Sequence, residues 1–431
     1  MEKSVIIPPK PCTEVCNDCS CHCVKKIVPV PTVDEALGLW LEKMPLREEK
    51  AEHIPLAQGL GRVLAEDVCA KVGVPVATCA THDGIAIHFE KSKAAFERGT
   101  RILQPGDFHH CPMGAAIPEQ FDSIVHAEQC KINSDGTATL LELPVQYQSV
   151  KIKGTYVGQG EQLAGAGEKL SPSHLALMQY TGHTTVSVKR QPKISIIPIG
   201  DDLVPPGTVP LAGQYIECDS VYIQSIAAQC GAQSTVFPIV ADRGEAIEAS
   251  IQKALPGCDI LVVIGGVGKG EVNYEDYTLG VVRKMGQIAC HGVQLSPGGK
   301  NMLLAQIDGK PLLGIPGPPH AAIIMTEYFL PPVIEWYMGC LLYERPVIQA
   351  VLEQDFPARG GGTSIWEPRV HVRETPGGYT ARLVGYMGET VENFIGANAS
   401  VSVTGDRDQY RKGKSIKAKL LVNERTITSN T

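Results

Sequence analysis

The residues best suited to chemistry in this chain form a glycine-rich loop, which reads IGGVGKG over positions 264–270. The loop follows an apolar run, so its glycines come directly after an expected buried strand, where backbone N–H groups can approach phosphate oxygens. Lys269 adds a positive charge at the same place. The spacing differs from that of a Walker loop, which ends in Lys-Ser or Lys-Thr, so a plain tight turn explains this loop alone equally well.

Two more loops of the same kind follow the first, SPGGK at 296–300 and IPGPP at 315–319. Three glycine-rich loops in one α/β region favour an anionic ligand, because exposed backbone N–H groups bind anions. The residues that we predict to contact this ligand, including one arginine from the last part of the chain, are Gly265, Gly266, Gly268, Lys269, Gly270, Pro297, Gly298, Lys300, Pro316, Gly317 and Arg369.

Acidic residues accompany these loops. Next to a phosphate, carboxylates repel the ligand unless a divalent cation lies between them, and this arrangement is typical of Mg²⁺ sites. Each acid alone is more often a turn former, a helix cap or a solvated charge, so only their clustering points to a site. The acids concerned are Asp201, Asp202, Glu217, Asp219, Asp242, Glu271 and Asp276. Among them, Glu217, Asp242 and Asp276 are the predicted Mg²⁺ ligands.

A second candidate metal site lies near the N-terminus, in the segment PCTEVCNDCSCHC. Thiolates are suited to zinc, copper(I) or an iron–sulfur cluster. However, a second Cys-x-x-Cys at zinc-finger distance is missing, and the Cys-x-Cys steps are closer than structural zinc sites favour, so a reduced, mobile tail is the preferred alternative. The candidate ligands are Cys12, Cys16, Cys19, Cys21 and Cys23.

The composition excludes several classes of protein. The 431 residues exceed one ordinary core and indicate two to four domains. The 39 Lys and Arg against 46 Asp and Glu, a formal charge of −7, leave no cationic field for a nucleic-acid backbone. We find no apolar run of the roughly 20 residues that a membrane helix needs, and no secretory signal, so we expect a cytoplasmic protein without membrane contact.

The elements that position the loops follow from hydrophobic spacing and from helix breakers. Residues 32–44 combine a Thr-x-x-Glu start with apolar residues at helical spacing, and Ser171 begins a second helix that ends near Tyr180. From about residue 63 to 142, short extended runs alternate with Gly and Pro, which predicts a β-rich insert. Beyond residue 346 strands and turns return, which predicts a small β domain.

The middle third of the chain predicts a doubly wound α/β domain. Expected strands and helices alternate there, as in parallel βαβ units, and in order they span 194–199, 220–230, 234–239, 244–255 and 259–264. In such sheets ligands bind at the carboxyl ends of the strands. Residues 200–202 and 265–270 should therefore share one cleft.

We therefore expect a multidomain α/β plus β protein with a cysteine-rich tail. A central doubly wound α/β domain is joined to an elongated N-terminal linker or dimer domain, a β-rich insert and a small C-terminal β domain. The expected boundaries are 1–28 for the tail, 29–60 with 145–190 for the linker domain, 61–144 for the insert, 191–342 for the α/β domain and 343–431 for the C-terminal domain.

A succession of motifs over roughly residues 30 to 425 resembles the molybdopterin molybdenumtransferase family (MoeA and the gephyrin E-domain). The motifs occur in the family's order and include VDEALGLW, HDGIAI, IPIGDDL, CDILVVIGGVGKGE, SPGGK, LLGIPGPP and GANASVSVTGDRDQYRKGKSIKAKLL. The resemblance implies an elongated homodimer of four-domain subunits. It also implies a Mg²⁺-dependent reaction that transfers molybdenum from molybdate into adenylylated molybdopterin and releases AMP.

Four acidic residues match functional positions of the family, and the resemblance implies that they are catalytic. Asp83 matches the aspartate of the SAMDG motif, and Asp202 matches the acid of the GDEL loop. Glu217 falls on the aspartate of the IxDxN motif. Asp276, with the tyrosine that follows it, matches the Asp-Tyr after the glycine loop.

The chain departs from the family at several loops. The family's GGVSVG, KPGKP and PGNP read GGVGKG, SPGGK and PGPP here, and the threonine of TGA is Met113. Lys269 and Lys300 are the candidates to restore the charge of the first lysine of KPGKP. Two classes of function remain. One is a divergent metal insertase for molybdate or tungstate, which the four retained acids favour, and the other is a non-catalytic relative that binds a molybdopterin-type ligand or acts as a scaffold.

Overall fold

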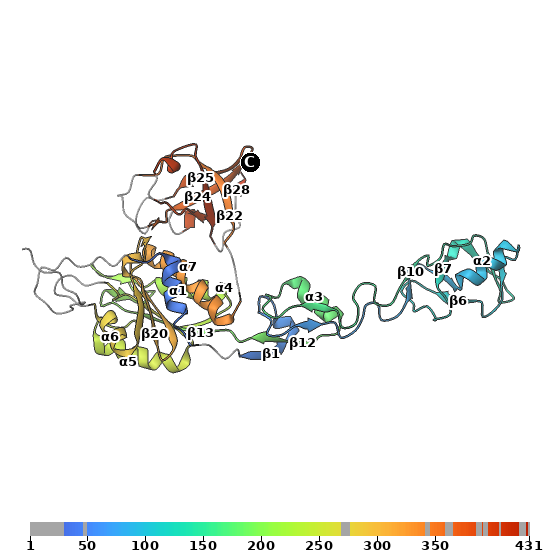
Figure 1. The fold of residues 1–431 in the computed structure, drawn as a ribbon, viewed down its shortest axis with the longest axis horizontal. Helices are drawn as coiled ribbons and strands as arrows, with labels where there is room; N and C mark the ends of the chain where they lie inside the picture. Colours follow the sequence, from blue (N-terminus) through green and yellow to red (C-terminus); the bar gives the residue numbers. More distant parts are fainter. Residues whose placement is uncertain are drawn as a thin grey trace, which may run out of the picture.

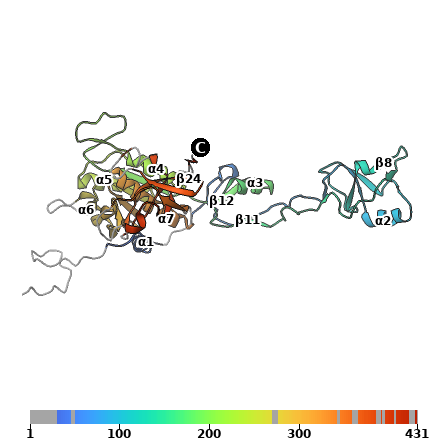
Figure 2. The same cartoon turned by 90° about the horizontal axis from the view of Figure 1, so that it is seen from above.

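The computed structural model shows an elongated chain, with an α/β body and a C-terminal β domain at one end and a small β-rich domain at the tip of an arm (Figure 1). The view from above shows the same arrangement (Figure 2). The five cysteines of the predicted tail site, Lys269 and Gly270 lie outside the described residues. The structure describes residues 30–45, 50–268, 276–340, 345–357, 365–384, 390, 395–404, 407–421 and 428–429.

The body is built on a six-stranded sheet with the order β16-β13-β17-β21-β20-β18. β16, β13, β17 and β21 are parallel neighbours, which confirms the predicted parallel unit. β20 and β18 continue the sheet in antiparallel pairing, which the sequence analysis did not predict. The strands are β13 (Lys193–Pro198), β16 (Gln233–Val236), β17 (Ile260–Ile264), β18 (Gln287–His291), β20 (Leu303–Ile307) and β21 (Lys310–Ile315).

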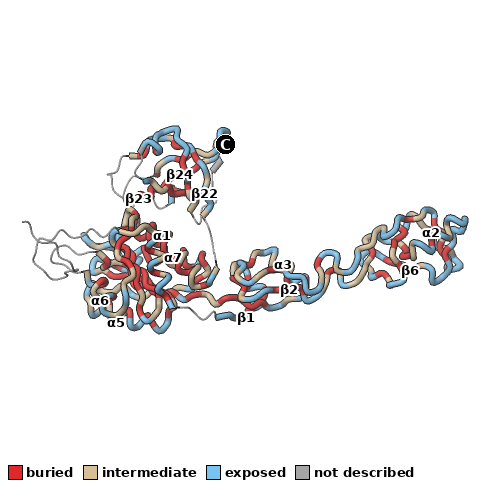
Figure 3. The backbone as a smooth tube through the Cα atoms, viewed as in Figure 1, coloured by how far each residue is buried: buried red, intermediate tan, exposed pale blue. Residues whose placement is uncertain are grey.

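Helices cover both faces of this sheet, because its central strands are apolar on both sides. α1, α4 and α7 bury one face around Trp40, Phe329 and Ile324, and α5 and α6 bury the other around Ile251 and Val282. Figure 3 shows the buried segments concentrated in this body. The helices are α1 (Val33–Leu41), α4 (Asp219–Gln229), α5 (Gly244–Ala254), α6 (Tyr277–Met285) and α7 (Pro319–Met338). Shorter elements of the body are β14 (Leu203–Val204), β15 (Tyr215–Ile216), η3 (Leu255–Gly257), β19 (Leu295–Ser296) and η4 (Gly299–Asn301).

The first helix belongs to the body and not to the arm. Thr32 and Glu35 form the predicted capping box. Trp40 is fully buried and donates its indole N–H to the carbonyl oxygen of Ala305 at 2.7 Å. The expected linker domain includes this helix within 29–60, whereas the structure packs it against β18 and α7. The physical reason is that a helix with a buried tryptophan needs a large apolar partner, which the sheet supplies and the thin arm does not.

The arm consists of two chain segments that leave the body and return to it (Figure 1). Near the body its core contains Leu64, Met178 and Val188, and Ser171 caps the helix there as predicted. Further out, the two segments are joined by short antiparallel pairs. The elements are β1 (Ala51–Pro55), η1 (Leu56–Gln58), β2 (Val68–Cys69), β3 (Cys79–Ala80), β10 (Val150–Lys151), β11 (Gln162–Ala164), α3 (Pro172–Tyr180) and β12 (Thr185–Lys189).

The domain at the tip contains two three-stranded sheets, β6-β4-β7 and β5-β9-β8. Their apolar faces form two small cores, one with Phe121 and Ile124 and one with Ile87 and Leu140. The predicted β-rich character of this segment is confirmed, with α2 as an unpredicted addition. The elements are β4 (Gly84–Ile87), α2 (Phe89–Glu97), β5 (Ile102–Leu103), β6 (Phe108–Cys111), β7 (Ser123–His126), η2 (Ala127–Gln129), β8 (Cys130–Ile132) and β9 (Ala138–Leu140).

The C-terminal domain is a mixed sheet of order β25-β22-β27-β26-β24-β28, and the additional pairing of β25 with β24 closes it into a small barrel. Phe356, Trp366 and Tyr410 pack inside it, as expected for the predicted small β domain. Its elements are β22 (Val347–Leu352), β23 (Ile365–Trp366), β24 (Arg369–Thr375), β25 (Gly378–Leu383), β26 (Ala399–Ser400), η6 (Arg407–Tyr410), β27 (Ser415–Leu420) and β28 (Thr428–Ser429). In the part of the chain that the structure describes, no helix has the length and apolarity needed to cross a membrane.

Candidate ligand site at the sheet edge

The carboxyl ends of β13 and β17 lie side by side near the centre of the sheet. From β13 the chain crosses to β16 on one side and then returns past β13 to β17, so the direction of winding reverses between these two strands. Ligands of doubly wound sheets bind at such a point. The residues that follow the two strands meet there as predicted, since a Cβ added to Gly265 would lie only 2.4 Å from the carbonyl oxygen of Ile199.

Residues of α6 and β18 hold the first glycine loop in place. Gly265 and Gly266 have φ values of +91° and +64°, and a Cβ added to Gly266 would lie 2.3 Å from Oγ1 of Thr278. Only glycine satisfies both conditions without strain. The hydroxyl of Thr278 donates to the carbonyl oxygen of Gly265 at 3.3 Å, and Nε2 of His291 lies 2.9 Å from the carbonyl oxygen of Val267. The described part of the loop, residues 265–268, is therefore held in place by its neighbours.

The second and third glycine loops converge on the first. Gly298 has a φ of +91°, and a Cβ added to it would lie 3.2 Å from Cγ of Pro316. A Cβ added to Gly317 would lie 3.8 Å from Cα of Gly265. Lys300 is exposed two residues beyond Gly298. Three segments that are distant in the sequence thus form one backbone surface with a lysine nearby.

Four aspartates gather near the carboxyl ends of β13 and β17, a region that we call the sheet edge. Burial raises the pKa of Asp242, and the charges of Asp276, Asp201 and Asp202 raise it further. Burial also raises the pKa of Asp276, although the hydrogen bond from the backbone N–H of Gly268 opposes this. Oδ1 of Asp242 is buried without a hydrogen-bond partner among the described residues. Asp242 therefore stands among like charges with an oxygen that no described hydrogen-bond donor satisfies.

The other predicted acids of the body take different positions. The carboxylate of Glu217 accepts a hydrogen bond from the backbone N–H of Ser220 at 2.8 Å, so it caps the start of α4. Asp202 is exposed just beyond the end of β13. Within the ranges that the structure describes, no group of three or more His, Cys, Asp or Glu side chains is arranged to hold a metal ion. A Mg²⁺ site made by Glu217, Asp242 and Asp276 therefore stays a prediction.

Arg369 lies elsewhere, at the junction between the body and the C-terminal domain. Its buried guanidinium donates to both carboxylate oxygens of Glu327, at 2.7 and 3.1 Å. Arg345 and Tyr222 also donate to Glu327, at 3.2 and 2.5 Å. Burial raises the pKa of Glu327, but the two arginines outweigh it and hold the pKa below its usual value. We call these four residues the junction cluster. The contact predicted between Arg369 and a ligand gains no support from this placement.

Asp83 directly precedes β4, which pairs with β6 and β7. Figure 1 shows β6 and β7 in the domain at the tip of the arm, away from the body. The carboxylate of Asp83 accepts the backbone N–H of Met113 at 2.8 Å, and its carbonyl oxygen accepts the N–H of Ala127 at 3.1 Å. Within one chain Asp83 does not join the acids of the sheet edge. The sequence pattern predicted the residue as a site candidate but carried no information about this separation.

The sequence analysis missed Thr278 and His291, which hold the first glycine loop. Thr278 comes two residues after Asp276, at the start of the helix that follows the loop, so its position was a usable signal. His291 ends β18, an edge strand. Only the antiparallel pairing of that strand brings the histidine to the loop, and nothing in its local sequence indicates this pairing.

Comparison with known proteins relates both the arm and the body to one family. Residues 31–182 match the model of the MoeA N-terminal region (domain I and II), and residues 195–336 match the model of a probable molybdopterin binding domain. The chain belongs to the molybdopterin molybdenumtransferase family. The resemblance read from the motifs is thus confirmed, and all three glycine loops lie within the segment matched to molybdopterin binding.

Relatives of this family match almost the whole chain at low identity. A molybdopterin molybdenumtransferase of Haemophilus influenzae is 24% identical over 401 residues, which cover 89% of this chain and 97% of that protein. One of Bacillus subtilis is 25% identical over 425 residues, 93% of this chain and 96% of that protein. A crystal structure of a MoeA protein from Pyrococcus horikosii has a TM-score of 0.78 and 24% identity, and the match covers 91% of this chain and 99% of the other. This chain is a divergent member with the family's fold.

Proposed function

We propose that this protein transfers molybdenum from molybdate into adenylylated molybdopterin and releases AMP. The observation that carries the proposal is the convergence of three glycine loops on a sheet edge that also holds Asp242 and Asp276. Backbone N–H groups suit the diphosphate that joins the pterin to AMP, and a lysine such as Lys300 adds charge. The match to molybdenumtransferases over nearly their full length supports the same reaction, so a purely non-catalytic role is not favoured.

One observation supports a Mg²⁺ ion bound by the acids of the sheet edge. Oδ1 of Asp242 is buried and lacks a hydrogen-bond partner among the described residues, and the carboxylate of Asp276 lies close enough to raise its pKa. Oxygen ligands of this kind are the ones that Mg²⁺ prefers. We propose that Asp242 and Asp276 hold the cation, with Glu217 as a third candidate. When bound, the cation neutralises phosphate charge beside the scissile bond.

The chain's own residues contribute positioning and charge. Asp276 accepts the N–H of Gly268 and so orients the first loop, while Thr278 and His291 hold the loop's carbonyl groups. A loop fixed in this way presents its remaining N–H groups to a diphosphate without further reorganisation, which favours cleavage of the phosphoanhydride. Lys269 is proposed as an additional cation in this loop.

We propose that the active form is a homodimer. The family resemblance implies one, and the position of Asp83, whose role the same resemblance implies, supplies a structural reason. Its loop sits at the end of the arm, far from the body of its own chain (Figure 1). A role for Asp83 in the same reaction therefore requires the body of a second subunit. Asp202 remains a proposed catalytic acid of the sheet edge, and a cytoplasmic location is likewise proposed.

Release of AMP tests the proposed function. The full chain is mixed with adenylylated molybdopterin, Mg²⁺ and either molybdate or tungstate, and AMP is quantified by chromatography. We expect AMP release that depends on the added oxyanion, and the more effective oxyanion identifies the metal. Tight binding of the pterin nucleotide without AMP release under any of these conditions would contradict the proposal. Sedimentation of the same sample tests the homodimer separately.

A further inference from the structure

The loop that carries Asp83 is fixed from three directions. The carboxylate of Asp83 accepts the N–H of Met113 at 2.8 Å, and its carbonyl oxygen accepts the N–H of Ala127 at 3.1 Å. The N–H of Thr81 donates to the carbonyl oxygen of Ser149 at 2.8 Å. The loop is short and links β3 to β4, so these contacts come from three separate segments of the tip domain.

A pair of stacked histidines adds a fourth contact. The rings of His82 and His126 lie with centroids 4.7 Å apart and planes at 19° to each other. His82 directly precedes Asp83 and is exposed. Its Nδ1 lies 3.1 Å from the hydroxyl of Thr81. The family motif SAMDG reads ATHDG here, so this histidine occupies the position of the motif's methionine.

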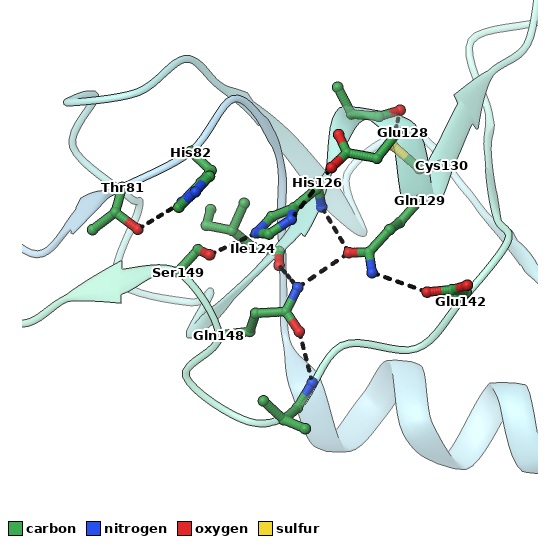
Figure 4. A network of polar contacts seen from close by, with 12 residues as sticks. Thr81, His82, Ile124, His126, Glu128, Gln129, Cys130, Glu142, Gln148 and Ser149 are labelled. Atoms are coloured by element: carbon green, nitrogen blue, oxygen red, sulfur yellow. Dashed lines mark hydrogen bonds and ion pairs between the residues drawn. The ribbon is translucent and has the colours of Figure 1, made fainter.

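Figure 4 shows how His126 is held as the fixed member of the pair. Nε2 of His126 lies 2.6 Å from the hydroxyl of Ser149, and Nδ1 lies 3.6 Å from a carboxylate oxygen of Glu128. The backbone N–H of His126 donates to the side chain of Gln129 at 3.3 Å, and Gln129 is bonded in turn to Gln148 at 3.1 Å. His126 is the last residue of β7, and these contacts tie it to the residues that follow β7 and to residues 148 and 149, which lead into β10.

Ser149 links the two halves of this network. Its carbonyl oxygen accepts from Thr81 and its hydroxyl contacts His126. Its φ of +53° lies in the left-handed region, which is uncommon for serine and costs on the order of 1 kcal/mol. A residue keeps such a conformation where its surroundings determine it strongly. Ser149 thus contacts Thr81, just before Asp83, through its carbonyl oxygen, and His126 on β7 through its hydroxyl.

We propose that His82 and His126 are positioning residues for Asp83. This rests on the proposed function, in which Asp83 takes part in the reaction. The stacked rings fix the backbone immediately before Asp83, and His126 transmits the fixed position of Ser149 to His82. The contact lies outside the two apolar cores of the tip domain, so its loss affects the loop more than the fold.

The test compares variants that keep or remove the stacking. In His82→Ala and His126→Leu we expect kcat for AMP release to fall about tenfold with KM for the pterin nucleotide within about twofold, since small displacements of a reacting group lower turnover strongly. His82→Phe keeps a stacking ring and should retain kcat within about threefold. His109→Ala, an exposed histidine on β6 of the same domain, is the matched control and should behave as the unsubstituted chain.

Hydrogen exchange at the backbone N–H of Met113 reports on Asp83 without any need for activity. We expect faster exchange of this amide in His82→Ala and His126→Leu, and restored protection in His82→Phe. Unchanged exchange and unchanged kcat in His82→Ala would overturn the proposal. A fall in kcat with Met113 still protected would also overturn it, because the histidine would then act on the substrate directly.

Failure of the proposed function has a different signature from failure of this inference. If the unsubstituted chain releases no AMP, the proposed function fails, and the exchange of Met113 alone decides whether the histidine pair positions Asp83. If AMP is released and the exchange pattern does not follow the stacking, the reaction stands and the positioning role is wrong.

Discussion

A buried group of charges and a half-buried one are built in opposite ways in this protein. In the junction cluster, Glu327 meets two arginines and a tyrosine hydroxyl, so its charge is compensated and its pKa is lowered. At the sheet edge, Asp242 lies among the like charges of Asp276, Asp201 and Asp202, and burial raises the pKa of both Asp242 and Asp276. The difference separates a charge that joins two domains from charges that we propose bind a ligand. Compensated charges favour structure, whereas uncompensated ones mark candidate sites.

The largest effect expected from this comparison is on stability at the junction. Glu327→Gln removes the carboxylate that pairs with the buried Arg369 and the partly buried Arg345, so we expect a loss of about 3–5 kcal/mol in the free energy of unfolding. Urea denaturation of the full chain measures it. Glu248→Gln, which breaks the more exposed pair with Lys284, is the matched control and should cost about 1 kcal/mol or less. Equal losses of unfolding free energy in the two variants would show that the junction cluster stabilises the protein no more than an exposed ion pair does.

The second effect concerns activity at the sheet edge. Asp276→Asn retains an oxygen for the N–H of Gly268 but removes the negative charge proposed to bind Mg²⁺. We expect AMP release to fall at least about 100-fold, or about 2.7 kcal/mol, without any loss of stability, since the pKa of Asp276 is raised in the folded protein. Asp308→Asn, in the exposed turn between β20 and β21, is the control. Normal turnover in Asp276→Asn would exclude this residue from the site.

A smaller effect is expected for the lysine of the first loop. Lys269 stands in the loop whose family counterpart reads GGVSVG, and it is proposed to replace the lost lysine of KPGKP. Lys269→Ala should weaken binding of the pterin nucleotide by about 1.5–3 kcal/mol, the usual contribution of a charge-assisted hydrogen bond. Calorimetric titration measures the affinity. An unchanged affinity would mean that this lysine does not replace the lost cation.

The raised pKa of Asp242 predicts how the stability of the protein depends on pH. Because the pKa of Asp242 is raised in the folded protein, its ionised form is disfavoured there, and folding loses stability as the pH rises through the folded pKa. Asp242→Asn should therefore raise the melting temperature at pH 7, and this gain should vanish as the pH falls toward about 4. Glu119→Gln, an exposed acid of the tip domain, should show no such crossover. A melting temperature that drops at pH 7 would show that Asp242 is compensated after all.

The smallest effect is expected at the N-terminus. The family match begins at residue 31, and prolines bracket the cysteine-rich segment. Deletion of residues 1–26 should leave the melting temperature within a few degrees, because the segment is bracketed by prolines and the family match starts only after it. Any effect should appear as lost metal uptake. A truncated chain that fails to fold would show that the tail is part of the structure.

Much of the fold was readable from local patterns. The capping box at Thr32 and Glu35, the cap at Ser171 and the alternation of strands and helices in the body all involve residues close in sequence. The antiparallel edge of β20 and β18 was not readable, because it depends on pairing between distant strands. The same holds for α1, whose apolar face has no local signal for which domain it covers.

In the candidate site, too, features set by residues close in sequence could be predicted, and features set by distant elements could not. The glycine loops were identified from their own residues, and the rule for doubly wound sheets predicted only that residues 200–202 lie beside the first of them. The convergence of the second and third loops on the first was not predicted. The contacts of His291 and the ion pairs of Arg369 could not be predicted, because both are made by residues from remote elements. An arginine in a strand carries no local sign of whether it faces a ligand or a buried glutamate.

The most direct test of the central claim is a crystal structure of the full chain with adenylylated molybdopterin and Mg²⁺. We predict that the diphosphate lies against the backbone N–H groups of the first glycine loop and that the cation is bound by Asp242 and Asp276. Ligand bound away from the three converging loops, or a cation without contact to either aspartate, would contradict the account.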